Sequence, residues 1–145
     1  MKRFISLCSV LSLFLVVYSL MACAPKNDKD GIQFFEGTLQ DALNKAKTEQ
    51  KPIFIDIYAT WCGPCKLLKR KTFTNKEVGS YFNTNYISLS LDGEKGDGAI
   101  LANKYRIPGY PTLIVLNKNG ELVNMETGYL DANDLLAFGK QAFQK

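Results

Sequence analysis

Cys62 and Cys65 lie three positions apart in the stretch TWCGPCK at residues 60–66. Residues at this spacing share one face of a helix, and a helix that begins near Cys62 points unpaired amide groups at its sulfur. The partial positive charge there stabilises a thiolate, so Cys62 is interpreted as the residue that attacks a substrate disulfide. Cys65 lies one turn deeper and less exposed, where it can resolve the mixed disulfide. The pair predicts thiol–disulfide exchange, with the Cys62–Cys65 disulfide as the redox group and no further cofactor.

The two residues between the cysteines fit this chemistry. Gly63 permits a tight turn, and Pro64 suits the first turn of a helix, where its missing N–H costs nothing. Together they fix the spacing of the two sulfurs.

Three other uses of a cysteine pair compete with this interpretation. A structural zinc site needs four ligands, and the sequence has no His and no second pair of free cysteines. A static disulfide that closes so small a loop gains little stability and leaves the neighbouring Trp61, Gly63 and Pro64 unexplained. Capture of copper(I) by two soft thiolates would be a binding function. Copper capture and the static disulfide both stay open.

The start of the chain indicates export. Lys2 and Arg3 precede an uncharged, mostly apolar run at residues 4–22, which is typical of a secretory signal. The letters LMAC at residues 20–23 resemble the bacterial lipobox, in which the signal is cut before a cysteine that then carries lipid. Cys23 is therefore the expected lipidation site. A retained membrane anchor is the alternative, because about 20 apolar residues span a bilayer.

The sequence then divides into a lipoprotein signal peptide (1–22), a lipidated cysteine with a flexible tether (23–31) and one domain (32–145). Cys8 leaves with the signal. Without Lys2 and Arg3 the formal charge falls from +4 to +2, with 16 Lys and Arg against 14 Asp and Glu, so no nucleic acid partner is indicated. We expect a domain held at the membrane of a bacterial cell envelope, facing the periplasm or the exterior.

Hydrophobic periodicity predicts alternating helices and strands across the domain. Helical patterns cover 38–50 behind the N-cap Thr38, 64–72, a segment from a capping box at 74–77 to about Phe82, a short piece at 99–105, and 132–143. Strand patterns cover 53–59, which is apolar on both faces, 86–91, which alternates, and 112–116 and 121–129, which flank a turn.

This order predicts an α/β fold with a central mixed β-sheet flanked by helices. A βαβ unit with a right-handed parallel crossover is followed by a ββα unit that begins with a hairpin. The acidic loop DGEKGDG at 92–98 suggests calcium, but position twelve of a calcium-binding loop counted from Asp92 is Asn103 and not Glu. We interpret it as an ordinary loop.

Three local features resemble the thioredoxin family, over about residues 36–145. They are Asp56 six residues before Cys62, the motif WCGPCK at 61–66 that ends in Lys66, and GYPT at 109–112. The stretch KRKTFTNKEVGSYFN at residues 69–83 is similar to bacterial thioredoxin-like lipoproteins.

The resemblance implies a role for each matching residue. Asp56, an acid in an otherwise apolar strand, would be a buried proton acceptor for Cys65; the alternative is a solvent-facing strand residue. Pro111 would follow a cis peptide bond and face the cysteines, and the backbone of Tyr110 would pair with an extended substrate segment. Trp61 would be an exposed contact surface, or else part of the core. One departure is the strand YISLSL, which has Ser where many thioredoxins carry a Lys near the buried acid.

The direction of electron flow is the least determined property. Oxidising relatives usually place a His between the cysteines, and this chain has Gly63 and Pro64 there, which favours a reductase. A reductase in an oxidising cell envelope must be re-reduced, so we expect an electron-donating membrane protein as a partner besides the protein disulfide substrates. These substrates are either misoxidised proteins in general or cytochrome c precursors. The alternatives are a disulfide donor or isomerase, and a tethered binding module for copper or unfolded clients.

Overall fold

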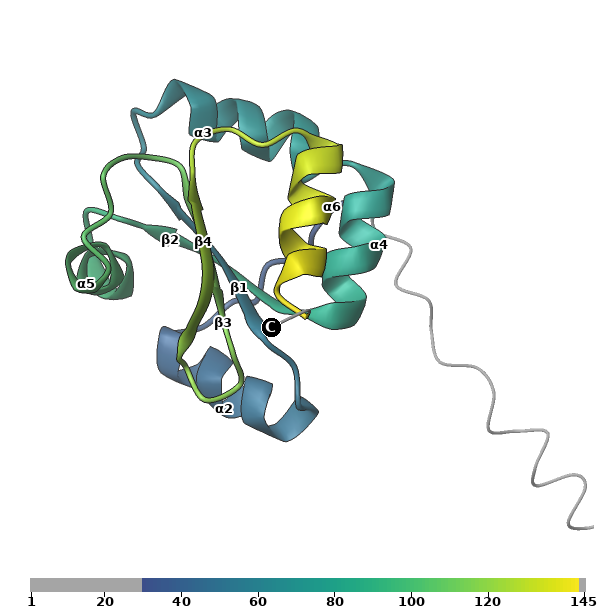
Figure 1. The fold of residues 1–145 in the computed structure, drawn as a ribbon. Coiled ribbons are helices and arrows are strands. Elements are labelled where there is room, and N and C mark those ends of the chain that lie inside the picture. The colour runs from purple at the N-terminus through teal and green to yellow at the C-terminus, as the bar shows by residue number, and fades with distance from the viewer. Residues whose placement is uncertain (1–29, 144–145) are drawn as a thin grey trace, which may run out of the picture.

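A four-stranded sheet with helices on both faces forms the domain, in a computed structural model that describes residues 30–143 (Figure 1). The predicted signal peptide, Cys8, the expected lipidation site Cys23 and most of the predicted tether lie outside the described residues. Among residues 30–143, no helix has the length and apolar character needed to cross a membrane.

The sheet is mixed, as predicted. Its strands are β1 (Ile53–Tyr58), β2 (Ile87–Asp92), β3 (Thr112–Leu116) and β4 (Leu122–Thr127). They lie in the order β2-β1-β3-β4, with β1 parallel to β2 and antiparallel to β3, and with β3 and β4 antiparallel. Because β1 is central and covered on both faces, a run of apolar residues on both of its sides is what the fold requires there.

The helices divide between the two faces of the sheet. They are α2 (Leu39–Glu49), α3 (Gly63–Leu67), the π-helical turn η1 (Leu68–Thr72), α4 (Lys76–Asn85), α5 (Gly96–Lys104) and α6 (Ala132–Gln141). In Figure 1, α2 and α5 lie on one side of the sheet, and α4 and α6 lie together on the other. Each face has its own apolar core, one around Ile55 with α2 and α5 and one around Phe54 with η1, α4 and α6. Asp56 is on the same side of β1 as Phe54, since side chains alternate along a strand.

The predicted capping box at residues 74–77 is wrong. The N-cap of α4 is Asn75, whose side-chain oxygen accepts hydrogen bonds from the backbone N–H groups of Glu77 and Val78. Thr74 instead donates its hydroxyl to the carbonyl of Arg70 at 2.8 Å, because the preceding turn brings that carbonyl within reach. The helix also runs three residues past the predicted end, to Asn85.

The segment predicted as one helix over 64–72 changes its winding partway. The N–H of Phe73 donates to the carbonyl of Leu68, five residues back, at 3.0 Å. A turn with this bonding holds one more residue than an α-helical turn and so changes the direction of the side chains within it. The helical piece predicted at 99–105 differs as well, because α5 begins at Gly96, inside the predicted loop.

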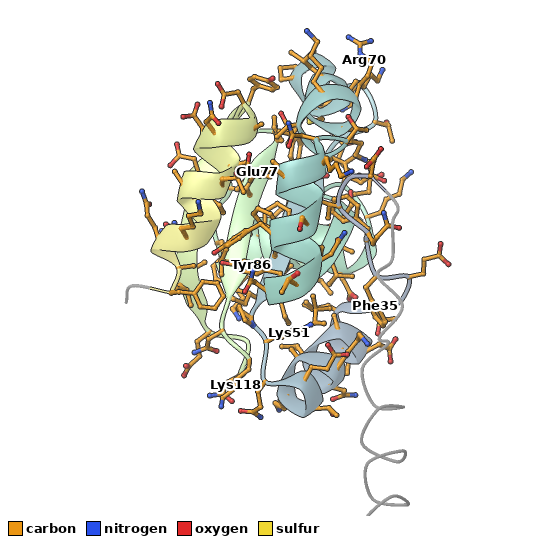
Figure 2. All side chains as sticks on the ribbon, turned by 90° about the vertical axis from the view of Figure 1, so that its right-hand side faces the viewer. Phe35, Lys51, Arg70, Glu77, Tyr86 and Lys118 are labelled. Atoms are coloured by element: carbon orange, nitrogen blue, oxygen red, sulfur yellow. A yellow bond between two sulfur atoms is a disulfide. The ribbon has the colours of Figure 1, made fainter. Side chains whose placement is uncertain are left out.

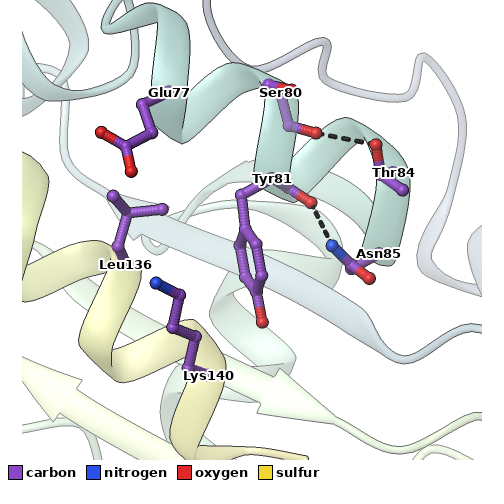
Figure 3. Close-up of a pocket in the computed structure, with 7 residues that line it drawn as sticks. All are labelled: Glu77, Ser80, Tyr81, Thr84, Asn85, Leu136 and Lys140. Atoms are coloured by element: carbon purple, nitrogen blue, oxygen red, sulfur yellow. Dashed lines mark hydrogen bonds between the residues drawn. The ribbon is translucent and has the colours of Figure 1, made fainter.

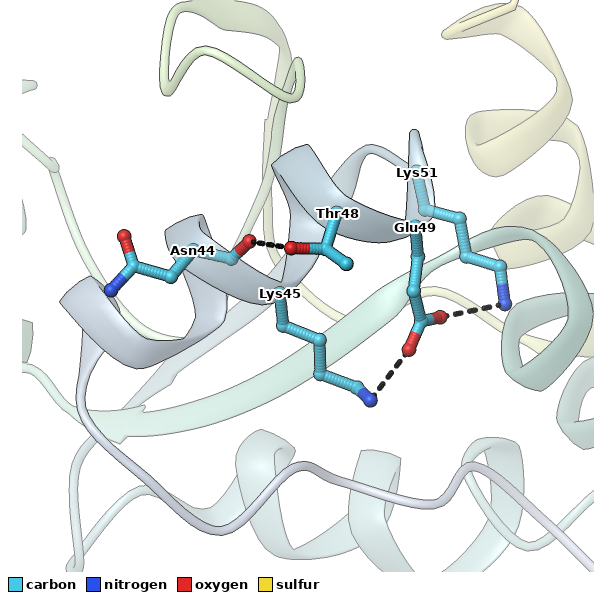
Figure 4. A network of polar contacts seen from close by, with 5 residues as sticks. All are labelled: Asn44, Lys45, Thr48, Glu49 and Lys51. Atoms are coloured by element: carbon cyan, nitrogen blue, oxygen red, sulfur yellow. Dashed lines mark hydrogen bonds and ion pairs between the residues drawn. The ribbon is translucent and has the colours of Figure 1, made fainter.

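Helix α2 begins as the sequence predicts. Thr38 and Asp41 form a capping box, each side chain bonded to the backbone N–H of the other. Near its end, Glu49 pairs with Lys45 at 2.6 Å and with Lys51 at 3.2 Å (Figure 4). These ion pairs are partly exposed, so they contribute little to stability.

An N-terminal arm, residues 30–35, lies against η1 and α4. The N–H of Ile32 donates to the carbonyl of Phe73 at 2.7 Å, and the side chain of Asn83 donates to the carbonyl of Gly31 at 3.0 Å. Gly79 of α4 lies close to Gly31, because a Cβ added to Gly79 would be 2.5 Å from the carbonyl carbon of Gly31. At the far end of α4, Tyr86 (Figure 2) anchors α6 by donating its hydroxyl to the carbonyl of Gly139 at 2.6 Å. The start of the domain is thus fixed beside the turn that follows the cysteines.

Candidate active site

A disulfide joins Cys62 and Cys65 at the junction of β1 and α3, with an S–S distance of 2.01 Å and 5.3 Å between the Cα atoms. Cys62 is the N-cap of α3, and its sulfur accepts a hydrogen bond from the N–H of Cys65 at 3.1 Å. A backbone donor therefore points at the sulfur that the sequence assigns as the nucleophile. In the reduced protein, the same donor would stabilise a thiolate there.

Exposure does not distinguish the two cysteines in this oxidised state. Cys65 is expected to be less exposed than Cys62, yet the two are 2% and 3% exposed. The reason is local packing, since Ala59 forms a small cluster with the pair and the side chains of Tyr58 and Tyr110 cover it.

Asp56 is fully buried, which excludes the alternative of a solvent-facing strand residue. One carboxyl oxygen, Oδ2, accepts a hydrogen bond from the hydroxyl of Ser90 at 2.8 Å, and the other, Oδ1, has no partner. Burial raises the pKa of Asp56 to about 6, against the hydrogen bond from Ser90 and the charge of Lys69, which both lower it. A carboxyl group with this pKa and a free oxygen can gain and lose a proton near neutral pH.

Lys69 is a site residue that sequence reasoning missed. Its ammonium lies 3.2 Å from the centre of the Tyr58 ring, and its positive charge acts on Asp56 from η1. The sequence draws attention only to a Lys that is lacking in β2, the strand that carries Ser88 and Ser90. It gives no sign that the helix side supplies a cation, because Lys69 is one of four basic residues between 66 and 71 and the π-helical turn decides which of them faces the sheet.

Trp61 lies on the surface beside the disulfide, with 67% of its side chain exposed. Its indole N–H donates to the carboxylate of Glu94 at 3.0 Å, and its ring meets that of Tyr110 edge to face at 6.1 Å. The core alternative for Trp61 is therefore excluded. Glu94, 33 residues away in the loop after β2, is a second contact that the sequence did not indicate.

The remaining motif residues lie around this surface. Gly63 and Lys66 are exposed, and a Cβ on Gly63 would meet no atom within 4 Å. Pro64 is in the first turn of α3. The peptide bond between Tyr110 and Pro111 is cis.

Gly93 makes room for the Tyr110 ring that covers the cysteines. A Cβ added to Gly93 would collide with the Tyr110 ring and would lie 2.8 Å from the Tyr110 hydroxyl oxygen. The loop after β2 thus touches the site twice, through Gly93 and through Glu94.

The part of the surface that the structure describes also has hollows away from the cysteines. One lies between α4 and α6, lined by Glu77, Tyr81 and Lys140 among others, and the polar bonds in it are local ones within α4 (Figure 3). Over residues 30–143, no three His, Cys, Asp or Glu side chains gather as a metal site would require. In the loop at 92–98, Asp92 accepts a bond from the N–H of Glu94, and Asp97 accepts one from the N–H of Leu39 at 2.7 Å.

A family model described as a thioredoxin-like domain matches residues 39–143. The solution structure of a protein from Bacteroides thetaiotaomicron, provisionally described as a disulphide-isomerase, is 41% identical and superposes with a TM-score of 0.72. The match covers 81% of this chain and 98% of that one.

Two relatives from other classes are also similar. Thioredoxin Y2, chloroplastic, of Arabidopsis thaliana is 38% identical over 90 residues, which are 62% of this chain and 50% of its own length. The thiol:disulfide interchange protein DsbD of Pseudomonas fluorescens is 29% identical over 101 residues, which are 68% of this chain and 17% of its own length. This chain thus spans half or less of the length of these two relatives. It belongs to the thioredoxin-like domain family of disulfide oxidoreductases and isomerases, with Cys62 and Cys65 forming the disulfide at the start of α3.

Proposed function

We propose that this chain is an exported, membrane-tethered thiol–disulfide oxidoreductase that reduces protein disulfides in the cell envelope. The observation that carries the proposal is the disulfide between Cys62 and Cys65, which lies beside an exposed aromatic surface and has a backbone donor on the Cys62 sulfur. The protein needs no cofactor beyond this disulfide.

The reaction proceeds in two exchanges. The thiolate of Cys62 attacks one sulfur of a substrate disulfide, that S–S bond breaks, and the other substrate sulfur leaves as a thiolate. Cys65 then attacks the Cys62 sulfur of the mixed disulfide and releases the second substrate sulfur. Asp56 accepts the proton of Cys65 in this second step, on the oxygen that has no partner. The substrate is now reduced, and the protein holds the disulfide.

Trp61, Tyr110 and Pro111 receive the substrate. Trp61 offers an exposed ring beside the cysteines, and the backbone of Tyr110 next to the cis Pro111 bond pairs with an extended substrate segment. Lys66, Gly63 and Pro64 shape the turn and set the spacing of the sulfurs.

The tether and the electron source complete the proposal. Lipid on Cys23 holds the domain at the membrane, where an electron-donating membrane protein returns the pair to the dithiol. The similarity to a thiol:disulfide interchange protein supports a partner of this kind. A labelled fatty acid supplied to the cells should mark the wild-type protein and leave Cys23→Ala unmarked; a wild-type protein that takes up no label and stays in the membrane fraction would favour the retained anchor.

A disulfide isomerase is the second candidate, supported by the 41% identity to the protein from Bacteroides thetaiotaomicron. An isomerase would rearrange the bonds of a protein with scrambled disulfides and finish as the dithiol, whereas a reductase would consume one dithiol for each bond that it reduces.

A redox titration tests the proposal. The full chain, purified in detergent, is equilibrated with a dithiol couple while the fluorescence of Trp61 is followed. A reductase should have a potential at or below about −250 mV, near that of thioredoxin at about −270 mV. A value above about −180 mV would point to a disulfide donor or isomerase. The variant Cys65→Ser is the control, since it cannot form the disulfide; a wild-type protein without a reversible transition would support the static disulfide or copper capture.

A further inference from the structure

Ser90 is the only described hydrogen-bond partner of the Asp56 carboxylate, and it also reaches solvent. The carboxyl group of Asp56 is fully buried, while Ser90 is half-buried and bonded to it at 2.8 Å. Ser90 also lines a surface pocket of about 390 Å³ together with Lys69, Phe34, Phe73 and Asp30. The hydroxyl of Ser90 therefore stands between the buried acid and water.

Lys69 is held at the same pocket by the π-helical turn. Its side chain is half-buried, with the ammonium 3.2 Å from the centre of the Tyr58 ring. Tyr58 follows Asp56 by two residues in β1, so both side chains project from the same face of the strand. The aromatic ring attracts the cation and limits where it can go, which keeps a positive charge near Asp56.

We propose that Ser90 and Lys69 are positioning residues for Asp56: Ser90 relays the proton between the carboxyl group and the water of the pocket, and Lys69 supplies the positive charge that favours the carboxylate. The proposal rests on the proposed function, in which Asp56 takes the proton of Cys65. A cation from η1 then does the work for which the resemblance suggests a Lys in β2.

The proton of Cys65 passes through Asp56 and Ser90 to water. When Cys65 attacks the Cys62 sulfur, its thiol proton passes to the Asp56 carboxylate as the S–S bond to the substrate breaks. The carboxylic acid then turns its protonated oxygen toward Ser90, and the Ser90 hydroxyl, which donates to Oδ2 in the resting carboxylate, rotates to a pocket water. The acid donates its proton to the Ser90 oxygen as the Ser90 hydroxyl proton passes to that water, and Asp56 is again a carboxylate. No proton is gained or lost except to water.

Lys69 is the charged group that affects the ionisation of Asp56. From β1 and α3 come Tyr58 and the cysteine pair, and the pair is joined as a disulfide, which carries no charge. The register of the sheet places Leu113 of β3 opposite Asp56, and it does not titrate. From the N-terminal arm, Asp30 lines the pocket and is exposed. Of the charged side chains, Lys69 is the one whose charge lowers the pKa of Asp56.

Carbon-13 NMR of the Asp56 carboxyl carbon tests the proposal without using the redox reaction. The full-length oxidised protein is titrated, with Asp56→Asn to assign the signal. We expect a pKa of about 6 for the wild type. Lys69→Met should raise it by about half a unit or more, which is about threefold in the carboxylate fraction below the pKa. Lys69→Arg should restore the wild-type value, and Lys71→Met, an exposed lysine of the same turn, should leave it unchanged.

Ser90 is tested in the same way. Ser90→Ala should raise the pKa of Asp56, because the carboxylate loses its hydrogen bond, while Ser90→Thr keeps a hydroxyl and should stay near the wild type. In single-turnover release of substrate by Cys65, the pH at half-maximal rate should move with the NMR value in each variant.

The possible results distinguish a failure of the roles of Ser90 and Lys69 from a failure of the proposed function. Equal pKa values in Lys69→Met, Lys71→Met and the wild type would overturn the role of Lys69, and an unchanged value in Ser90→Ala would overturn that of Ser90. Either result leaves the proposed function standing. If Asp56→Asn releases substrate as fast as the wild type, then Asp56 is not the proton acceptor, and both the relay and that step of the mechanism are refuted.

Discussion

Replacing Asp56 by Asn is predicted to stabilise the folded protein at neutral pH. Burial raises the pKa of this carboxyl group from its ordinary value of 3.8 to about 6. The folded protein therefore keeps the proton up to about pH 6, whereas the unfolded chain loses it near 3.8, so stability falls as the pH rises through this window and stays lower above it. The difference corresponds to about 3 kcal/mol at pH 7. A neutral amide of the same shape avoids this loss.

Urea unfolding of the oxidised proteins at two pH values measures the effect. At pH 7.5, Asp56→Asn should exceed the wild type in unfolding free energy by up to about 3 kcal/mol. At pH 3.5, where the wild-type carboxyl is mostly protonated in both states, the two should agree closely. Glu36→Gln, which neutralises an exposed acid, is the control and should follow the wild type at both pH values.

Asp56→Asn should also slow the release of substrate, although it stabilises the folded protein. With a pKa of about 6, the carboxylate fraction of Asp56 falls from about 0.9 at pH 7 to about 0.1 at pH 5, so the release of substrate by Cys65 should slow about tenfold. In Asp56→Asn, stopped-flow measurements should find a slow rate without this dependence. A variant that is no more stable than the wild type at pH 7.5 would refute the reasoning, since it would mean that the buried carboxylate carries no desolvation cost.

Three further predictions concern the cysteine roles and the supports of the site. Cys65→Ser should trap a mixed disulfide with a substrate protein, visible on a non-reducing gel, and Cys62→Ser should not; trapping by both would contradict the assignment of the nucleophile. Asn75→Ala removes two bonds at the start of α4 and should cost about 1 kcal/mol in urea unfolding, whereas no loss would mean that another group caps this helix. Gly79→Ala should lower the thermal midpoint, because its Cβ would meet the backbone of the N-terminal arm at 2.5 Å; Gly109→Ala, with open space around it, should not, and equal midpoints would show that the arm can move away.

Much of the fold could be predicted because it depends on local patterns. The helical period after Thr38, the apolar run of β1 and the hairpin turn before β4 are each written in neighbouring residues, and the structure has an element at each place. The errors lie at the boundaries. A capping box needs only the right spacing, so the sequence predicts Thr74 as the N-cap of α4, while the choice of Asn75 depends on how the preceding turn ends.

The sequence by itself determined the reactive pair. Cys62 and Cys65 and the two residues between them predict the position of the disulfide. They also predict which sulfur lies at the N-terminus of the helix, because all of these residues belong to one helical turn. The surroundings of the pair depended on the tertiary structure. The burial of Asp56, its bond to Ser90 and the charge of Lys69 join residues that are 34 or 13 positions apart, and they arise only when β2 pairs with β1 and the π-helical turn aims Lys69 at the sheet. Sequence patterns record which residues are near along the chain, while a pKa is decided by what is near in space.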